Sequence, residues 1–167
     1  MPMARSWSFV PNDTYKSSRV LIQMLVDVVA KGGNLLLNIG PGPDGAWHDA
    51  AYDRLAALGA WMKDNSVAIY GTGPIAPYSS GQVHLTRGKD GAVSPMYLPG
   101  AAETPRPGRV AITGWTPAAG SAVTLLGAGG RVIPWERSAD GCVLLPPADL
   151  NPPNADAWVF RTSSAAR

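Results

Sequence analysis

The sequence is short of the residues that build covalent or metal-based frameworks. Cys142 is the only cysteine among 167 residues, which excludes an internal disulfide and any zinc site made of cysteines. Only two histidines occur, without carboxylates at ligand spacing, so we expect no protein-built metal site and no cofactor. We interpret Cys142, which precedes Val143 and Leu144, as a small core residue.

Charge and long apolar runs are also scarce. Charged residues make up 16 % of the chain, and scattered Lys and Arg leave a net charge of +2, so we expect no nucleic-acid partner. The run "VLIQMLVDVVA" is interrupted by Gln23 and Asp27 and is too short to span a bilayer, so no membrane partner is expected. The start "MPMARSWSF" has no apolar signal region, so we expect the chain as given to be cytoplasmic, although a longer parent could be exported.

Two further motif classes are missing. No Gly-x-Ser-x-Gly elbow is present, and "GPGPDG" lacks the Lys-Ser/Thr pair of a phosphate loop. A serine-hydrolase site and a nucleotide site are therefore not expected.

The first part of the chain, to about Tyr70, predicts a helix, a strand and a second helix. Ser17 or Ser18 can cap the first helix, which Gly32 and Gly33 end. The run "NLLLNI" over 34–39 has no alternation, which predicts a strand buried on both faces of a parallel sheet. The second helix is expected from about Asp49 to Asn65, with one apolar face formed by Tyr52, Leu55, Leu58 and Met62.

From about Gly71 the pattern changes to short β-rich runs separated by glycine and proline. These runs are "QVHLT", "AVSPMYL", "RVAITGW", "AVTLLG", "RVIPW", "CVLLP" and "AWVFRT". Their spacing of roughly ten to fifteen residues, with turns such as "KDG" and "ADG", favours an antiparallel sandwich. We expect Trp115, Trp135 and Trp158 to be core residues rather than an exposed sugar-binding platform.

Four stretches of the first part resemble one enzyme family. "SWSFVPNDTYKS", "LVDVVAKGGNLLLNIGPGPDG", "RLAALGAWMKDN" and "AIYGTGP" are similar to the end of the catalytic domain of α-L-fucosidases, glycoside hydrolase family 29. The resemblance covers about the first 75 residues strongly, and the remainder matches that family's C-terminal β-sandwich in pattern. It implies an α/β plus all-β fold: residues 1–72 as the truncated end of a (β/α)8-like barrel, and 73–167 as an antiparallel β-sandwich.

The resemblance also implies retaining hydrolysis of terminal α-L-fucose, from a fucosylated glycan or a small α-L-fucoside. Such hydrolysis uses two carboxyl groups, a nucleophile and an acid/base. The family's nucleophile is an aspartate on an earlier strand, which this sequence does not contain. In some members the acid/base is a glutamate just after the element that Trp7–Ser8–Phe9 resembles, which makes Asp13 a candidate acid/base. Asp13 can equally be a turn residue in "PND".

Five residues are candidates for substrate binding. Leu35 lies where some family members have an aromatic against the fucose methyl, and Asn38 ends the expected strand, where barrel enzymes place their chemistry. Trp7, Trp47 and His48 are the other candidates, since a tryptophan at a pocket rim can stack on a sugar face. Four of them also have a structural interpretation: barrel core for Leu35, hydrogen bonds to backbone groups for Asn38, packing against the sandwich for Trp47 and an exposed position without a role for His48.

Two functional interpretations remain open. One is the C-terminal portion of a fucosidase, and whether the chain is an active enzyme alone is left uncertain. The other is a non-catalytic carbohydrate-binding or assembly module derived from such an enzyme. In either case a strand apolar on both faces needs a cover, which predicts a homo-oligomer or a preceding segment over the open barrel edge.

Overall fold

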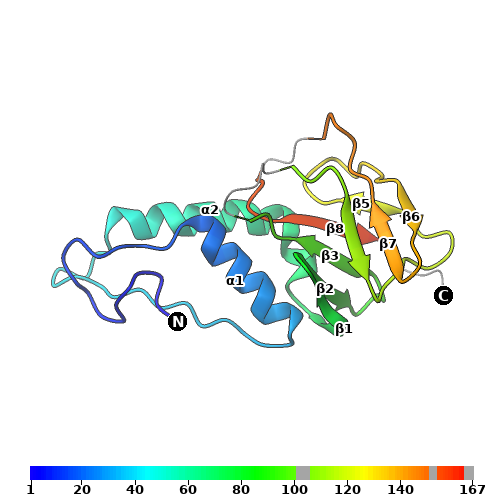
Figure 1. Ribbon diagram of the computed structural model, residues 1–167. Coiled ribbons are helices and arrows are strands. Elements are labelled where there is room, and N and C mark those ends of the chain that lie inside the picture. Colours follow the sequence, from blue (N-terminus) through cyan, green and yellow to red (C-terminus); the bar gives the residue numbers. More distant parts are fainter. Residues whose placement is uncertain (101–105, 151–153, 164–167) are drawn as a thin grey trace.

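A computed structural model describes residues 1–100, 106–150 and 154–163, and it contains both predicted helices (Figure 1). The first is α1 (Ser18–Ala30), and the hydroxyl of its N-cap Ser17 accepts a hydrogen bond from the N–H of Val20 at 3.3 Å. The second is α2 (Asp49–Asn65), which continues into the short 3-10 helix η1 (Ser66–Ala68). The predicted starts and ends of both α-helices are therefore confirmed.

The buried face of α2 differs from the predicted one. Tyr52 is 51 % exposed and Leu55 is 36 % exposed, whereas Ala51 and Trp61 are completely buried. Leu58 and Met62 of the predicted face do pack against the core while half-buried, so the buried face is shifted from the predicted one rather than opposite to it. Hydrophobic periodicity marks an apolar stripe but does not say which edge of that stripe is covered.

The apolar run 34–39 is not the strand that the sequence predicted. Among the described residues its β-pairing is limited to a parallel bridge between Pro2 and Asn38. Leu36 is 74 % exposed, while Leu35 and Leu37 are half-buried. A strand of a parallel sheet needs hydrogen-bonded strands beside it, whereas the backbone groups of Leu36 and Asn38 bond to Met1 and Met3 of the N-terminal segment. The expectation of burial on both faces was wrong for this reason.

The remainder of the described chain forms two antiparallel sheets. In the larger sheet the strand order is β1 (Thr72–Ser80), β2 (Val83–Gly88), β3 (Val93–Tyr97), β8 (Trp158–Thr162), β5 (Val123–Leu125). In the smaller sheet it is β4 (Val110–Thr113), β7 (Gly141–Leu144), β6 (Trp135–Arg137). All pairs between these strands are antiparallel. Each of the seven predicted β-rich runs contains or overlaps one of these strands.

Strand β1 was not predicted, because its sequence is rich in glycine and proline. It lies at the edge of the larger sheet, where Pro74 and Pro77 cost the fewest ladder hydrogen bonds. Its register with β2 shifts between Pro74 and Ser79. Because proline is tolerated in edge strands, the prolines that made β1 unrecognisable in the sequence also explain why it lies at the edge of the sheet.

One apolar cluster joins the two sheets. Side chains of β2, β5 and β8 from the larger sheet meet side chains of β4 and β7 from the smaller one. Trp158, 2 % exposed, is a core residue as predicted, and Trp115 and Trp135 pack against the cluster while half-buried. Cys142 is fully buried in the same cluster, which confirms its interpretation as a core residue.

A second cluster attaches both helices to the larger sheet. It contains residues of α1, α2, β3 and β8, with Trp61 of α2 completely buried in it. The indole N–H of Trp61 donates to the carbonyl of Ala157 at 3.1 Å. Helices and larger sheet therefore share one apolar core.

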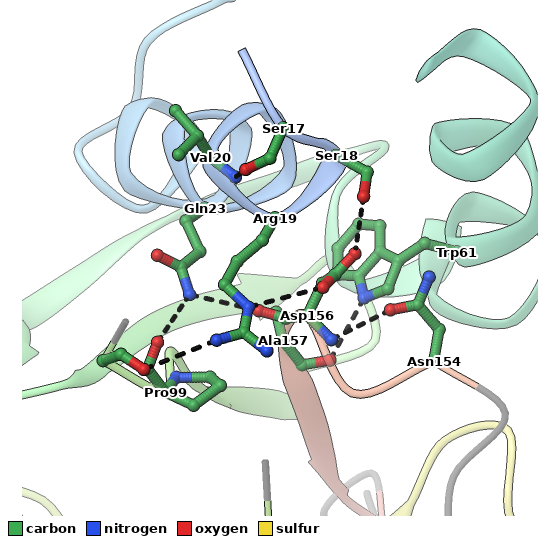
Figure 2. A network of polar contacts seen from close by, with 11 residues as sticks. Ser17, Ser18, Arg19, Val20, Gln23, Trp61, Pro99, Asn154, Asp156 and Ala157 are labelled. Atoms are coloured by element: carbon green, nitrogen blue, oxygen red, sulfur yellow. Dashed lines mark hydrogen bonds and ion pairs between the residues drawn. The ribbon is translucent and has the colours of Figure 1, made fainter. Parts of the chain in front are cut away.

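Polar contacts of α1 surround this attachment (Figure 2). Asp156 accepts a hydrogen bond from the hydroxyl of Ser18 at 3.1 Å and lies 3.5 Å from the guanidinium of Arg19. The side-chain amide of Gln23 donates to the carbonyls of Pro99 and Asp156 at 2.9 and 3.2 Å. The first half of α1 thus holds the segment that leads into β8. In the described part of the chain, no helix is long and apolar enough to cross a membrane.

Candidate functional site

The N-terminal segment and the loop before α2 lie together, at the end of the molecule away from the sheets (Figure 1). The backbone N–H of Met3 donates to the carbonyl of Asn38, and that of Asn38 donates to the carbonyl of Met1, each at 2.9 Å. The ammonium of Lys16 donates to the carbonyls of Pro2 and Ala4 at 2.8 Å. These bonds fix the loops that contain most of the predicted site residues.

Trp7 and Asn38 are brought into direct contact. The side-chain amide of Asn38 donates to the backbone carbonyl of Trp7 at 2.6 Å, while the indole of Trp7 is 59 % exposed. Beside them Gly40 passes so close to the chain that a Cβ there would lie 2.5 Å from the backbone nitrogen of Phe9. The side-chain NH2 group of Asn38 therefore holds the Trp7 loop, and the side-chain carbonyl oxygen of Asn38 remains for a ligand.

Asp13 folds back onto its own loop. Its carboxylate accepts hydrogen bonds from the backbone N–H groups of Ser6 at 3.0 Å and Thr14 at 2.7 Å. Desolvation acts to raise the pKa of Asp13, but the hydrogen bonds from Ser6 and Thr14 outweigh it and lower the pKa. This arrangement stabilises the ionised carboxylate and holds the loop between residues 6 and 14.

His48 is surrounded by aromatic rings. Its Nδ1 lies 3.3 Å from the hydroxyl of Tyr15, and its ring centroid is 4.6 Å from that of Phe9. Trp47 is half-buried and lies 5.4 Å, centroid to centroid, from Tyr52 on the first turns of α2. Desolvation, followed by the negative charge of Asp13, raises the pKa of Tyr15, so its hydroxyl stays protonated.

Leu35 lies apart from these loops. It lines a cavity of about 430 Å³ with residues of the α1 C-terminus and of the segment that leads into β1, among them Leu25, Ile69 and Tyr70. The structure therefore joins Trp7 to Asn38 and sets His48 against the aromatic residues of the N-terminal segment, while Leu35 lines a different cavity.

Phe9 and Tyr15 were not among the predicted site residues. Both contact His48 across more than thirty residues of sequence, and the aromatic pattern of "SWSFVPNDTY" was the signal that could have pointed to them. Within the described ranges, no group of three or more His, Cys, Asp or Glu side chains could hold a metal ion.

Known proteins similar to this chain fall in one family. The family model for α-L-fucosidase matches residues 1–67. Tissue α-L-fucosidase of Rattus norvegicus is 28 % identical over 165 residues, which are 93 % of this chain and 34 % of that relative. Residues 1–67 thus match the α-L-fucosidase family. The α-L-fucosidase of Branchiostoma floridae is 40 % identical over 73 residues, 42 % of this chain and 16 % of that protein.

Solved structures extend the similarity over the sheets. The α-fucosidase of Thermotoga maritima, solved in complex with fucose, has a TM-score of 0.80 at 25 % identity, covering 98 % of this chain and 38 % of that one. The fold of α-L-fucosidase isoenzyme 1 from Paenibacillus thiaminolyticus is also similar, with a TM-score of 0.78 at 23 % identity, covering 98 % of this chain and 38 % of that one. The chain therefore resembles the C-terminal part of α-L-fucosidases, and it spans 34 % of the length of the Rattus norvegicus relative and 38 % of each of these two solved chains.

Proposed function

We propose that this chain is the C-terminal part of an α-L-fucosidase-type glycoside hydrolase, which removes terminal α-L-fucose from a glycan or a small fucoside with retention of configuration. One observation carries the proposal: the fucose-bound Thermotoga maritima enzyme resembles 98 % of this chain at a TM-score of 0.80. The family match over residues 1–67 supports it, because those residues include the Trp7 and His48 loops.

The proposal divides the chain as the sequence suggested. Residues 1–72 form the end of a (β/α)8-like barrel, and 73–167 form an antiparallel sandwich. The order α1, apolar run, α2 supports the first assignment, and the cluster between the two sheets supports the second. The exposure of Leu36 is what a barrel strand without its neighbours would have, since such strands are normally covered on both faces.

Retaining hydrolysis requires two carboxyl groups about 5–5.5 Å apart, one of them protonated at the start of the reaction. Asp13 is the carboxyl group that lies in the Trp7 loop, and its backbone hydrogen bonds lower its pKa. A general acid at neutral pH needs a raised pKa instead. The resemblance places the family's nucleophile on an earlier strand that this sequence does not contain, so we assign the nucleophile to another segment. The acid/base role of Asp13 stays a prediction that requires its loop to reopen.

Substrate contacts are proposed for the rim formed by Trp7, Asn38, Trp47 and His48. The exposed indole of Trp7 offers a flat apolar surface for the fucose ring, and the Asn38 carbonyl oxygen offers an acceptor for a hydroxyl. Leu35 lines the cavity of about 430 Å³ and not this rim, so its predicted role as an apolar contact of fucose requires the sugar to reach that cavity.

We assign the open face to a preceding segment of the same protein. The relatives extend well beyond the matched region, since the chain covers 34 % and 38 % of two of them. Leu35 and Tyr70 line the cavity of about 430 Å³ on this face, and Tyr70 and Leu36, the neighbour of Leu35 in the chain, are 73 % and 74 % exposed. The chain alone should cover this face by self-association, and light scattering that found a stable monomer at micromolar concentration would contradict this.

Activity of the chain alone is tested with a chromogenic α-L-fucoside and highly purified protein, beside Asp13→Asn. The proposal expects no turnover above the blank from either protein, because a single carboxyl group cannot perform the double displacement. Turnover proportional to the concentration of the chain, and lost in Asp13→Asn, would show that the chain holds its own catalytic pair. Equal turnover in the two proteins would remove Asp13 from the mechanism.

A further inference from the structure

A cavity in the sheet region combines an aromatic wall with polar groups. It measures about 270 Å³ and is lined by Arg87 of β2, by Trp115, Thr116 and Ser121 of the loop that follows β4, and by Ser163 after β8. None of these residues belongs to the loops around Trp7 and His48. The cavity is therefore distinct from the site proposed for hydrolysis.

The aromatic wall is held in a fixed position. Trp115 packs against the cluster between the sheets, yet it stays half-buried and lines the cavity. The preceding Gly114 has φ +78°, and its N–H donates to the carbonyl of Asp140 at 2.7 Å. The positive φ favours glycine at this position, although a Cβ there would make only an ordinary contact with Pro77 at 3.4 Å. Trp115 thus presents a preorganised surface, which lowers the entropy cost of binding.

The polar groups of the cavity are available for a ligand. Within the described part of the chain, the guanidinium of Arg87 and the hydroxyls of Thr116 and Ser121 make no side-chain hydrogen bond. By contrast, the hydroxyl of Thr162 accepts from the N–H of Val93 at 2.9 Å and is therefore committed to the fold. Hydroxyls both donate and accept, and Arg only donates, so together they suit a ligand rich in hydroxyl groups.

The nearby charges leave Arg87 unpaired. Asp90, in the turn that follows β2, is held by Arg161, whose guanidinium lies 2.6 Å from its carboxylate. Hydrogen bonds from Ala92 and Arg161 lower the pKa of Asp90, against the effect of desolvation, which keeps this pair ionised. Arg87 therefore reaches the cavity without a carboxylate partner among the described residues.

We propose that this cavity binds a single pyranose unit of a glycan. The apolar face of the ring would lie against Trp115, while the hydroxyls of the sugar would bond to Thr116, Ser121 and Arg87. Its volume is just below the roughly 300–1,000 Å³ of sites for drug-sized ligands, so it fits one sugar unit with the rest of the glycan outside. The site would retain the glycan near the enzyme independently of hydrolysis.

Titration of the full chain with monosaccharides, followed by backbone amide NMR, tests this proposal. L-fucose, D-galactose, D-glucose and N-acetylglucosamine serve as probes, with sulfate as an anion control. We expect at least one sugar to shift the amides around Trp115 and Ser121 with a Kd of about 1 mM, equivalent to about −4 kcal/mol. Trp115→Ala should weaken that binding roughly tenfold or more, as truncation of a central aromatic anchor does.

Matched variants separate binding from folding. Trp135→Ala also removes a half-buried tryptophan that packs on the same cluster, but Trp135 does not line this cavity, so its affinity should equal that of the wild type. Arg87→Ala changes an exposed side chain and should weaken binding severalfold without loss of fold. Binding of sulfate but of no sugar would overturn the proposal, as would shifts confined to residues 1–48 or unchanged affinity in both Trp115→Ala and Arg87→Ala. Since no turnover is measured, failure here leaves the proposed hydrolase role untouched.

Discussion

Replacing Trp61 by alanine is expected to destabilise the whole chain, because this side chain joins α2 to the larger sheet. Trp61 is 0 % exposed and lies in the cluster shared by α1, α2, β3 and β8. Truncation of a buried Phe or Trp to Ala costs about 3–5 kcal/mol. A domain has a total free energy of unfolding of about 5–15 kcal/mol, so Trp61→Ala should remove a large share of it.

The hydrogen bond of Trp61 can be separated from its packing with Trp61→Phe. Phenylalanine keeps an aromatic ring but loses the N–H that donates to the Ala157 carbonyl at 3.1 Å. A buried acceptor left without its donor costs about 1–3 kcal/mol, so Trp61→Phe should be clearly less harmful than Trp61→Ala. The matched control is Trp7→Ala, which removes an indole that is 59 % exposed and should change stability by about 0.5 kcal/mol or less.

The measurement is urea unfolding followed by far-ultraviolet circular dichroism, which reports on helices and sheets together. We expect one cooperative transition whose midpoint falls in the order Trp7→Ala, Trp61→Phe, Trp61→Ala. The reasoning is refuted if Trp61→Ala unfolds within about 1 kcal/mol of the wild type. It is also refuted if the helices of the wild type unfold in a transition separate from that of the sheets.

Three further predictions concern single sites. Gly40→Ala should disrupt the Trp7 loop, because the new Cβ would lie 2.5 Å from the backbone nitrogen of Phe9. Gly59→Ala is the matched control in α2: its Cβ would meet nothing within 4 Å, and the substitution should raise the free energy of unfolding by about 0.5–1 kcal/mol. Urea unfolding of both variants measures the difference. The hydrogen bond from Lys31 lowers the pKa of Asp27, with a smaller contribution from His84 and against the effect of desolvation. The ionised Asp27 carboxylate therefore stabilises the fold above about pH 4, and this stabilisation is lost as the pH falls through the lowered folded-state pKa. Asp27→Asn should thus flatten the acid side of the stability profile, and an unchanged slope would contradict this. Burial raises the pKa of Cys142 to about 11, so a thiol reagent at neutral pH should label it only on unfolding, and fast labelling of the native chain would be the opposite result.

Local signals in the sequence located most of the regular elements. Ser17 and the glycine pair at 32 and 33 mark the ends of α1, and β-rich runs separated by glycine and proline mark seven of the strands. Strand β1 was missed because its prolines hide it, although its edge position accommodates them. The run 34–39 was predicted as a strand from its own composition, but strand formation depends on neighbours that the run itself does not encode.

The candidate site was predictable as a set of loops but not as a set of contacts. Trp7, Asn38 and His48 were correctly placed outside the helices. Their partners are 31 to 39 residues away in the sequence: the Asn38 amide bonds to the Trp7 carbonyl, and His48 contacts Tyr15 and Phe9. Such pairings follow from how the N-terminal segment packs on the loop before α2, which no local pattern specifies.

The central claim is that this chain can serve as the C-terminal part of an α-L-fucosidase. A chimera tests this claim most directly: the chain replaces the matching part of the Thermotoga maritima enzyme. The fold of that part resembles this chain with a TM-score of 0.80. The quantity to measure is the rate at which the chimera hydrolyses a chromogenic α-L-fucoside. The account predicts turnover that the chain alone lacks and that Gly40→Ala within the chimera abolishes. A folded chimera that releases no fucose would contradict it.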